Sequence, residues 1–357
     1  MPKIIFTGGG SAGHVTLNLA LIPWFLEHGW QVTYIGSNGG MEEELVKQFP
    51  TVVYKSILTG KLRRYFSLKN LADMVKIPLG CLQACALIHK ENPDIIFSKG
   101  GFVSFPVVVG GFINRKKIFM HESDITPGLA NKMSLPFVSN FFTTFPETIN
   151  TIKQKHKVHC VGPVMSPRLF NGSKKEGARF AGLKADKPTI MFIGGSLGAK
   201  SLNNAVAQNL KDLLQKYQII HIAGKNGYNP ELTGEGYVQY EYVDKELKDL
   251  MALADIVISR AGSNAIFELA SLCKPMILVP LPNTSSRGEQ SLNAKNFCNK
   301  GFATLITDET IVDKEILLST IEKVFKEKET YIKNMQQNPV KTTTIEDLCH
   351  QIITREK

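Results

Sequence analysis

Short apolar segments alternate with longer amphipathic segments along this chain, and most of the apolar segments end at a glycine or at a polar cluster. In the first half, the apolar runs predict strands at residues 3–6, 32–35, 52–57, 94–97, 117–120 and 141–143, with helical periodicity between them. Strands that alternate with helices specify a parallel sheet with helices on both faces.

The same pattern begins again at residues 189–193, where a predicted strand leads into a second glycine turn. A helix is expected at 202–217, and the further strands are expected at 219–223, 256–258 and 276–279. The sequence therefore predicts an α/β protein of two doubly wound, Rossmann-like domains facing a cleft. Ligands of such sheets bind beyond the carboxyl ends of the strands, so the active site is expected in that cleft.

The junction between the two domains is expected near Gly162, Pro163 and Pro167, because two prolines and a glycine stop regular structure. We assign residues 1–163 to the N-terminal domain and residues 164–340 to the C-terminal domain. The last helix, at 341–357, is expected to pack back on the N-terminal domain.

The first glycine turn, Gly8-x-Gly10-x-x-Gly13, has the form of a dinucleotide-binding fingerprint. That fingerprint also needs an acid about 20 residues on, at the end of the second strand, to hold a ribose. Here the strand ends at Ser37, and the next acid is Glu42. We therefore interpret the turn as a general phosphate cradle and not as an NAD site.

His14 follows this turn at the expected start of a helix, where a buried imidazole tends to stay neutral. A neutral imidazole can act as a general base or bind a phosphate, and a histidine that only caps or packs is the equal alternative. Two more polar clusters, 98–104 and 121–124, also follow strands, so all three should meet at one edge of the sheet. No histidine has metal-ligand spacing, so no metal site is predicted.

Residues 260–268 follow a strand and begin a helix, starting with Arg260-Ala261-Gly262. The first turn of a helix has unpaired N–H groups and the positive end of the helix dipole, which together stabilise a phosphate. Glu268 lies more than one turn further on, where a carboxylate could accept hydrogen bonds from a ribose diol. Phosphate and diol together indicate a nucleotide-sugar site, and an ordinary strand-to-helix turn with a solvated glutamate is the alternative.

Composition supports a soluble protein, with 43% hydrophobic and 21% charged residues and no apolar run near the length of a membrane span. The chain opens without a signal-peptide pattern, and its six cysteines form no CxxC pair, so we expect a cytoplasmic protein without disulfides. The net charge of +10 is uneven. Residues 1–160 carry 17 Lys and Arg against 10 Asp and Glu.

Part of that charge lies in residues 61–82, where Lys61, Arg63, Arg64, Lys69 and Lys76 are interleaved with apolar residues. Cations beside protruding apolar residues are typical of proteins that dock on anionic lipid. An inward-facing apolar stripe on an ordinary helix is the alternative.

Six motifs in order make the chain similar to one family over nearly its whole length. They are TGGGSAGH (7–14), SKGGFVSFP (98–106), HESDITPGLANK (121–132), GGSLGAKSLN (194–203), SRAGSNAIFE (259–268) and SRGEQSLNA (286–294). They resemble the MurG family of bacterial glycosyltransferases, which make peptidoglycan precursors. The resemblance implies the GT-B fold and inverting transfer of N-acetylglucosamine from UDP-N-acetylglucosamine to the C4 hydroxyl of undecaprenyl-diphosphoryl-N-acetylmuramoyl-pentapeptide.

The resemblance also implies roles for residues. The donor-binding residues would be Ser196, Val243, Ser263, Asn264, Ala265, Glu268 and Gln290. The acceptor's diphosphate would be held by Gly9, Gly10, Ser11, Gly13, Gly100 and Gly101. His14 is the first candidate for the base and Glu122 the second. The implied partners are the two substrates and an anionic membrane surface at 61–82, with no nucleic acid and no cofactor, and the implied location is the cytoplasmic face of the membrane, as a peripheral protein.

Two positions depart from the family pattern. The family usually has an arginine four residues after the glycine of the interdomain segment; here Ser166 stands there and Arg168 follows. Asp124 replaces the asparagine that many members place on the donor sugar. These departures keep open a non-catalytic nucleotide-sugar-binding protein. Two further alternatives share the fold, namely a diacylglycerol glycosyltransferase, which would also share the cleft and the membrane face, and a UDP-N-acetylglucosamine 2-epimerase.

Overall fold

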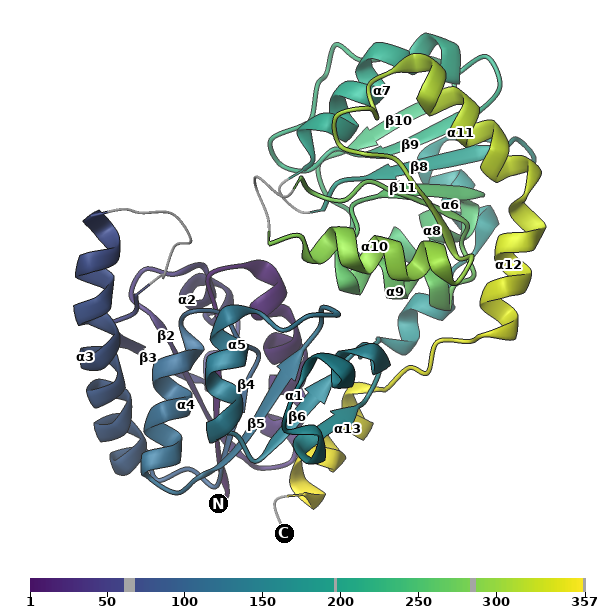
Figure 1. The fold of residues 1–357 in the computed structure, drawn as a ribbon. Coiled ribbons are helices and arrows are strands. Elements are labelled where there is room, and N and C mark those ends of the chain that lie inside the picture. The colour runs from purple at the N-terminus through teal and green to yellow at the C-terminus, as the bar shows by residue number, and fades with distance from the viewer. Residues whose placement is uncertain (61–67, 196–197, 283–286, 356–357) are drawn as a thin grey trace. The chain divides into compact units, whose positions relative to one another are not determined.

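The computed structural model describes residues 1–60, 68–195, 198–282 and 287–355, which fall into two compact units (Figure 1). One unit is Met1–Val164 together with Thr343–Lys357, and the other is Met165–Thr342. Each unit is a parallel sheet with helices on both faces, and each is described separately below.

The strands of the first unit run β3-β2-β1-β4-β5-β6-β7, all parallel. They are β1 (Lys3–Thr7), β2 (Gln31–Ser37), β3 (Val53–Ile57), β4 (Ile95–Ser98), β5 (Lys117–Glu122), β6 (Asn140–Thr143) and β7 (Val158–Cys160). The sequence predicted the first six within a few residues and missed β7, in which His159 interrupts the apolar pattern.

Alternate side chains of these strands build two cores, as the two-residue period of a strand requires. Phe6, Phe97 and Phe119 lie in the core on one face, with Phe25 of α1, and Ile5, Ile96 and Ile118 lie in the core on the other. The helices are α1 (Thr16–Glu27), α2 (Met41–Val46), α3 (Leu68–Glu91), α4 (Ser104–Ile113), α5 (Leu129–Ser134) and α13 (Ile345–Thr354). Short 3-10 turns are η1 (Ala12–His14), η2 (Leu135–Phe137), η3 (Pro146–Thr151) and η4 (Lys155–Lys157).

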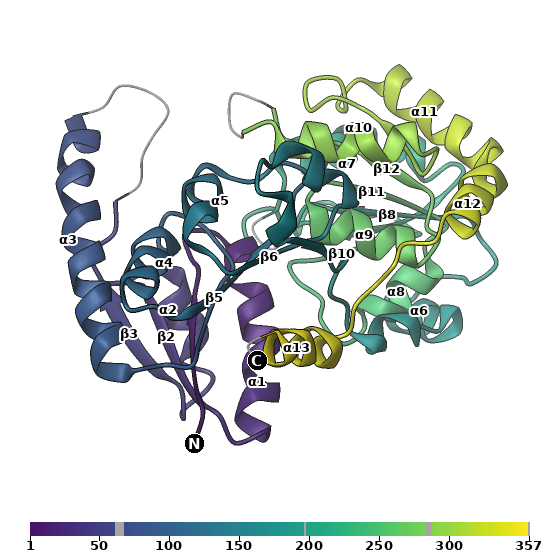
Figure 2. The same ribbon diagram turned by 60° about the horizontal axis from the view of Figure 1, so that its bottom comes forward.

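The end of the chain returns to the first unit. The N–H of Thr343 donates to the carbonyl of Pro163 at 2.9 Å, and Thr344 caps α13 through a reciprocal pair of bonds with Asp347. Leu348 and Ile352 then enter the core beside α1, and Figure 2 shows α13 in yellow next to that helix. This burial fixes the last helix to the N-terminal sheet.

The strands of the second unit run β10-β9-β8-β11-β12-β13, again all parallel. They are β8 (Thr189–Ile193), β9 (Gln218–Ile222), β10 (Tyr237–Tyr240), β11 (Ile256–Ser259), β12 (Met276–Leu278) and β13 (Ala303–Leu305). The helices are α6 (Lys174–Ala181), α7 (Lys200–Leu213), α8 (Leu247–Leu253), α9 (Ser263–Ser271), α10 (Glu289–Asn299), α11 (Lys314–Lys326) and α12 (Lys328–Gln337), with the 3-10 turn η5 (Pro167–Phe170) before them. The sequence missed β10 and β13.

In each sheet the chain reverses its direction of winding at one point. That point lies between β1 and β4 in the first unit and between β8 and β11 in the second. The loops after these four strands diverge to opposite faces of the sheet, which leaves room for a ligand at the carboxyl edge. The glycine motifs follow β1, β4, β8 and β11.

Two local expectations need correction. His14 lies in the 3-10 turn η1, and α1 begins only at Thr16, so the imidazole precedes the helix and is not in its first turn. The helix predicted at 202–217 spans Lys200–Leu213, because the chain must turn before β9 begins at Gln218. In the described part of the chain, no helix is both long enough and apolar enough to cross a membrane.

Candidate active site

The two glycine loops of the first unit touch each other at the reversal between β1 and β4. Gly101 has a φ of 86°, and a Cβ there would lie 2.3 Å from the carbonyl oxygen of Gly9 and 3.0 Å from Nδ1 of His14. Only glycine fits both the backbone angle and this space. The loops therefore depend on Gly101 to bring the polar cluster after β4 against the one after β1.

His14 lies half-buried at this contact. Its Nδ1 is 2.9 Å from Oγ of the exposed Ser11, so the serine hydroxyl sets the orientation of the ring. Gly13 is exposed, and nothing lies within 4 Å of where its Cβ would be. The Ser11, Gly13 and His14 side of the loop can therefore receive a ligand.

Glu122 ends β5 and is buried. Its Oε1 accepts from the N–H groups of Ser123 and Asp124 at 2.9 and 3.0 Å, and its Oε2 accepts from the N–H of Gly128 and Nδ2 of Asn131 at 3.0 and 2.9 Å. Burial, with the charge of Asp124, raises the pKa of this carboxyl. Both oxygens are used in holding the loop before α5.

Lys99 and His121, to which the sequence pattern assigned no role, are buried at the same edge of the sheet. Nζ of Lys99 donates to Oγ of Ser123 at 2.5 Å, and burial lowers its pKa while Glu122 and Asp124 oppose that shift. Burial, with the charge of Lys99, holds the pKa of His121 well below its usual value. The imidazole of His121 is therefore neutral at ordinary pH.

In the second unit, the motif after β11 has the predicted geometry. Gly262 caps α9 in an extended conformation, Ser263 is buried, Asn264 is exposed and Ala265 is half-buried. The first N–H groups of this nine-residue helix thus open at the reversal between β8 and β11. Burial raises the pKa of Glu268 to about 7, so this carboxyl is poised between its two charge states.

Arg260 ties together the loops around that helix, and the sequence reading did not assign it. Its guanidinium donates to the carbonyl of Val279 at 3.1 Å and to Oγ of Ser201 at 3.0 Å, and it pairs with the carboxylate of Asp308. Oγ of Ser201 also donates to Asp308 at 2.5 Å. One side chain therefore joins the chain after β11, β12 and β13 to the start of α7.

The other predicted donor-binding residues are more scattered. Oε1 of Gln290 accepts from the N–H of Leu281 at 3.1 Å, and Val243 is buried. Ser166 and Arg168 are exposed in and before η5, where Oγ of Ser166 caps the N–H of Arg168 at 3.4 Å. Asp124 is half-buried in the first unit, and Ser196 lies outside the described residues.

Among the described residues, no cluster of three His, Cys, Asp or Glu side chains is suited to binding a metal ion.

Glu42 is fully buried beneath the first glycine loop. In the sequence it stands only as an acid that comes too far after the second strand to hold the ribose of a dinucleotide. Its only sequence signal was a position in the first turn of α2, next to a predicted strand end.

Comparison with known proteins gives matches over almost the whole chain. Residues 4–143 match the glycosyltransferase family 28 N-terminal domain, and residues 189–352 match the C-terminal domain of that family. The UDP-N-acetylglucosamine–N-acetylmuramyl-(pentapeptide) pyrophosphoryl-undecaprenol N-acetylglucosamine transferase of Geobacillus kaustophilus is 48% identical over 94% of each chain. The enzyme of the same name from Clostridium tetani is 47% identical over 95% of this chain and 94% of its own.

Among solved structures, Acinetobacter baumannii MurG covers 99% of this chain and 100% of its own, with a TM-score of 0.77 at 22% identity. At that identity the likeness bears on the fold, and it confirms the two-unit glycosyltransferase fold predicted from the sequence.

Proposed function

The chain belongs to glycosyltransferase family 28, and from that premise we propose that it transfers N-acetylglucosamine from UDP-N-acetylglucosamine to undecaprenyl-diphosphoryl-N-acetylmuramoyl-pentapeptide. The observation that carries this is the identity of 47–48% over some 94% of the chain to enzymes named for that reaction. The reaction makes a lipid-linked disaccharide precursor of peptidoglycan.

We place the donor on the second unit. The N-terminus of α9 at Ser263, Asn264 and Ala265 would hold the diphosphate, because its unpaired N–H groups and dipole favour negative charge. Glu268 would accept hydrogen bonds from the ribose diol. Gln290 uses its Oε1 on Leu281, which leaves its Nε2 as the group to donate to the transferred sugar.

Val243 would lie against the uracil, and Ser196 would contact the diphosphate or the sugar. Arg168 or Ser166 would take the place of the family's interdomain arginine, and Asp124 would act on the donor sugar. These five assignments rest on the resemblance to the family.

The acceptor's diphosphate belongs, in this proposal, to the glycine loops of the first unit at Gly9, Gly10, Ser11, Gly13, Gly100 and Gly101. The base would be His14, because its ring lies at the contact of the two loops and is oriented by Ser11. Glu122 remains second, since four N–H donors already occupy its oxygens.

The chemistry then follows the demands of inversion. The base takes the proton of the C4 hydroxyl of the muramoyl sugar as that oxygen attacks C1 of the donor. The bond from C1 to the UDP oxygen breaks on the opposite face, and the N–H groups at the start of α9 stabilise the departing diphosphate. The new glycosidic bond has the β configuration.

The direct test is to incubate the protein with labelled UDP-N-acetylglucosamine and the lipid-linked muramoyl-pentapeptide. We expect the label in a β-linked disaccharide on the lipid, together with free UDP. Label in UDP-N-acetylmannosamine would instead identify an epimerase, and label in diacylglycerol would identify a glycolipid glycosyltransferase; either result would exclude the proposal.

A membrane surface is the third partner we propose, and exposed apolar side chains on the first unit support it. Val75, Leu79 and Leu82 follow one face of α3 and are 62%, 45% and 68% exposed. The basic residues 61–67 and the side chains up to residue 74 lie outside the described part, so this face is argued from its later half.

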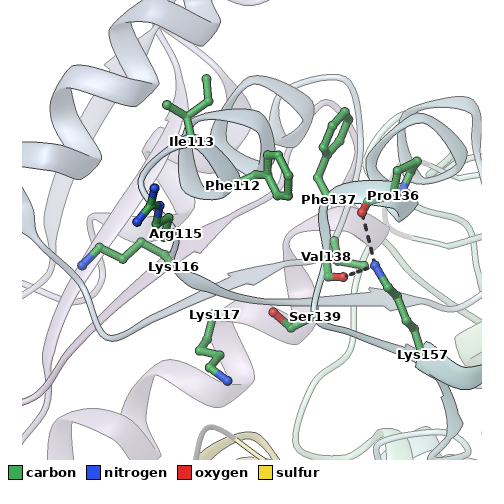
Figure 3. A pocket seen from close by; sticks show the side chains of 10 residues that line it. All are labelled: Phe112, Ile113, Arg115, Lys116, Lys117, Pro136, Phe137, Val138, Ser139 and Lys157. Atoms are coloured by element: carbon green, nitrogen blue, oxygen red, sulfur yellow. Dashed lines mark hydrogen bonds between the residues drawn. The ribbon is translucent and has the colours of Figure 1, made fainter.

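A second group of exposed apolar side chains lies at the end of α4. Nδ2 of Asn114 donates to the carbonyl of Cys85 at 3.0 Å, so the end of α4 lies beside α3. There Phe112 and Ile113 are 52% and 59% exposed and help to line a pocket of about 580 Å³ (Figure 3). Four cations line it, Arg115, Lys116, Lys117 and Lys157. Apolar groups beside cations suit the headgroup region of an anionic membrane, and we place the protein on the cytoplasmic face as a peripheral protein.

Sedimentation with vesicles containing anionic phospholipid tests this surface. We expect the double variant Leu79→Asp/Leu82→Asp to bind such vesicles about tenfold or more weakly, because two exposed leucines that would enter the lipid are replaced by charges that anionic lipid repels. Ile316→Asp is the matched control, because Ile316 is an exposed aliphatic residue of the same size on α11 of the second unit. It should bind the vesicles like the wild type. Equal binding by all three proteins would rule out this face of α3.

A further inference from the structure

Glu42 is a buried carboxylate in a place where burial is costly. It is 0% exposed, although its neighbours Glu43 and Glu44 on α2 reach the surface. A buried carboxylate must be paired or hydrogen-bonded, so its position is determined by the groups around it. Those groups belong to the end of β2 and to the first glycine loop.

Three hydrogen bonds hold the carboxylate. Oε1 accepts from the N–H of Ser37 at 3.0 Å and from the hydroxyl of Ser37 at 2.5 Å, and Oε2 accepts from the N–H of Gly10 at 3.4 Å. The hydroxyl of Tyr54 fixes Ser37 in turn, by donating to its carbonyl at 2.6 Å. Glu42 therefore connects the end of β2 to the loop after β1.

Glycines make the space for this side chain. A Cβ on Gly9 would lie 2.5 Å from Cδ of Glu42, one on Gly36 would lie 2.9 Å from its Cγ, and one on Gly40 would lie 2.5 Å from its Oε1. The glycine at position 9 is thus required by the carboxylate beneath the loop. In a dinucleotide-binding domain, an acid near this strand end would face the ribose; here it faces the underside of the loop.

The loop that rests on Glu42 carries the groups to which we assign the acceptor. Gly10 precedes Ser11, whose hydroxyl orients the His14 ring at 2.9 Å, and the carbonyl of Gly9 packs against Gly101 of the second loop. A shift of Gly9 and Gly10 would therefore move both the imidazole and the contact between the loops.

We propose that Glu42 is a positioning residue for the acceptor, which supports the Gly9–Gly10 loop from beneath and, through Ser11, sets the place of His14. This inference rests on the proposed function, because it assumes that the acceptor binds these loops. It assigns to Glu42 no contact with either substrate.

The test compares Glu42→Gln with Glu44→Gln by measuring the kinetic constants for each substrate separately. Glu44 is on the same helix but exposed, where it pairs with Lys47. In Glu42→Gln the amide keeps the shape but presents an NH2 group to one of the N–H or O–H donors. We expect kcat/KM for the lipid acceptor to fall about 10- to 100-fold, with KM for UDP-N-acetylglucosamine within about twofold of the wild type.

Ser37→Ala is the milder second variant, since it removes one donor and keeps the carboxylate. It should show a smaller loss of the same kind, confined to the acceptor. The proposal is overturned if Glu42→Gln and Glu44→Gln have the same kinetic constants. It is also overturned if Glu42→Gln loses thermal stability and its kcat/KM falls by the same factor for both substrates. If the wild-type protein makes no disaccharide at all, the proposed function fails; if it does and Glu42→Gln is unaffected, only this inference fails.

Discussion

Replacement of His14 by alanine is expected to lower kcat by about 10²- to 10⁴-fold, the usual range for loss of a general base. The ring lies where the two glycine loops of the first unit meet, and Ser11 holds it through Nδ1. For Nε2 to take a proton, Nδ1 must carry the hydrogen, which the hydroxyl oxygen of Ser11 can accept. Ser11→Ala should therefore lower kcat by a smaller factor.

The measurement is turnover at saturating concentrations of both substrates. His156→Ala, at an exposed histidine of the same unit, is the control and should keep wild-type turnover. A kcat within about twofold of the wild type in His14→Ala would remove His14 as the base and direct attention to Glu122. Binding of the donor by His14→Ala should be unchanged, because the donor is assigned to the second unit.

The second large effect is expected at Glu268. Its alanine variant should raise the apparent KM for UDP-N-acetylglucosamine by about 10- to 100-fold, since hydrogen bonds to a charged group contribute about 1.5–3 kcal/mol. KM for the lipid acceptor should remain unchanged. Glu322→Ala, at an exposed glutamate of the same unit that pairs with Lys216, is the matched control. The reverse pattern would mean that donor and acceptor are assigned to the wrong units.

Glu268 also predicts a pH dependence with a definite sign. Burial raises its pKa to about 7, and only the ionised form can accept both hydrogen bonds of a ribose diol. Donor affinity should therefore rise as pH rises through 7, by about tenfold between pH 6 and 8 for a group with that pKa. Glu268→Gln should show a flat profile over this interval. If donor affinity still rises between pH 6 and 8 in Glu268→Gln, the pH dependence comes from another titratable group.

The local parts of the candidate site could be predicted because each is encoded by adjacent residues. Gly262 and Ser263 come a few residues after an apolar run, so the strand, the turn and the start of α9 can be read in one stretch. The short strands β7, β10 and β13 were missed because a polar residue interrupts each of them, whereas β12, which is as short, is a continuous apolar run. His14 was expected at the start of a helix and lies in a 3-10 turn two residues before α1, because such a turn has no distinct apolar pattern.

The sequence alone determined the two α/β domains, the glycine turns at the ends of the strands and, through six motifs, the family. The strand order decided the rest, because it puts β1 beside β4 and β8 beside β11, and only then do Gly9 and Gly101 touch. Glu42 and Arg260 acquire their partners in the same way, from residues up to 59 positions away that reach them only in the folded sheet. Periodicity in the sequence indicates which face of a helix or strand is buried. The polar partner of a buried side chain depends on how distant elements pack, so only the tertiary structure decides it.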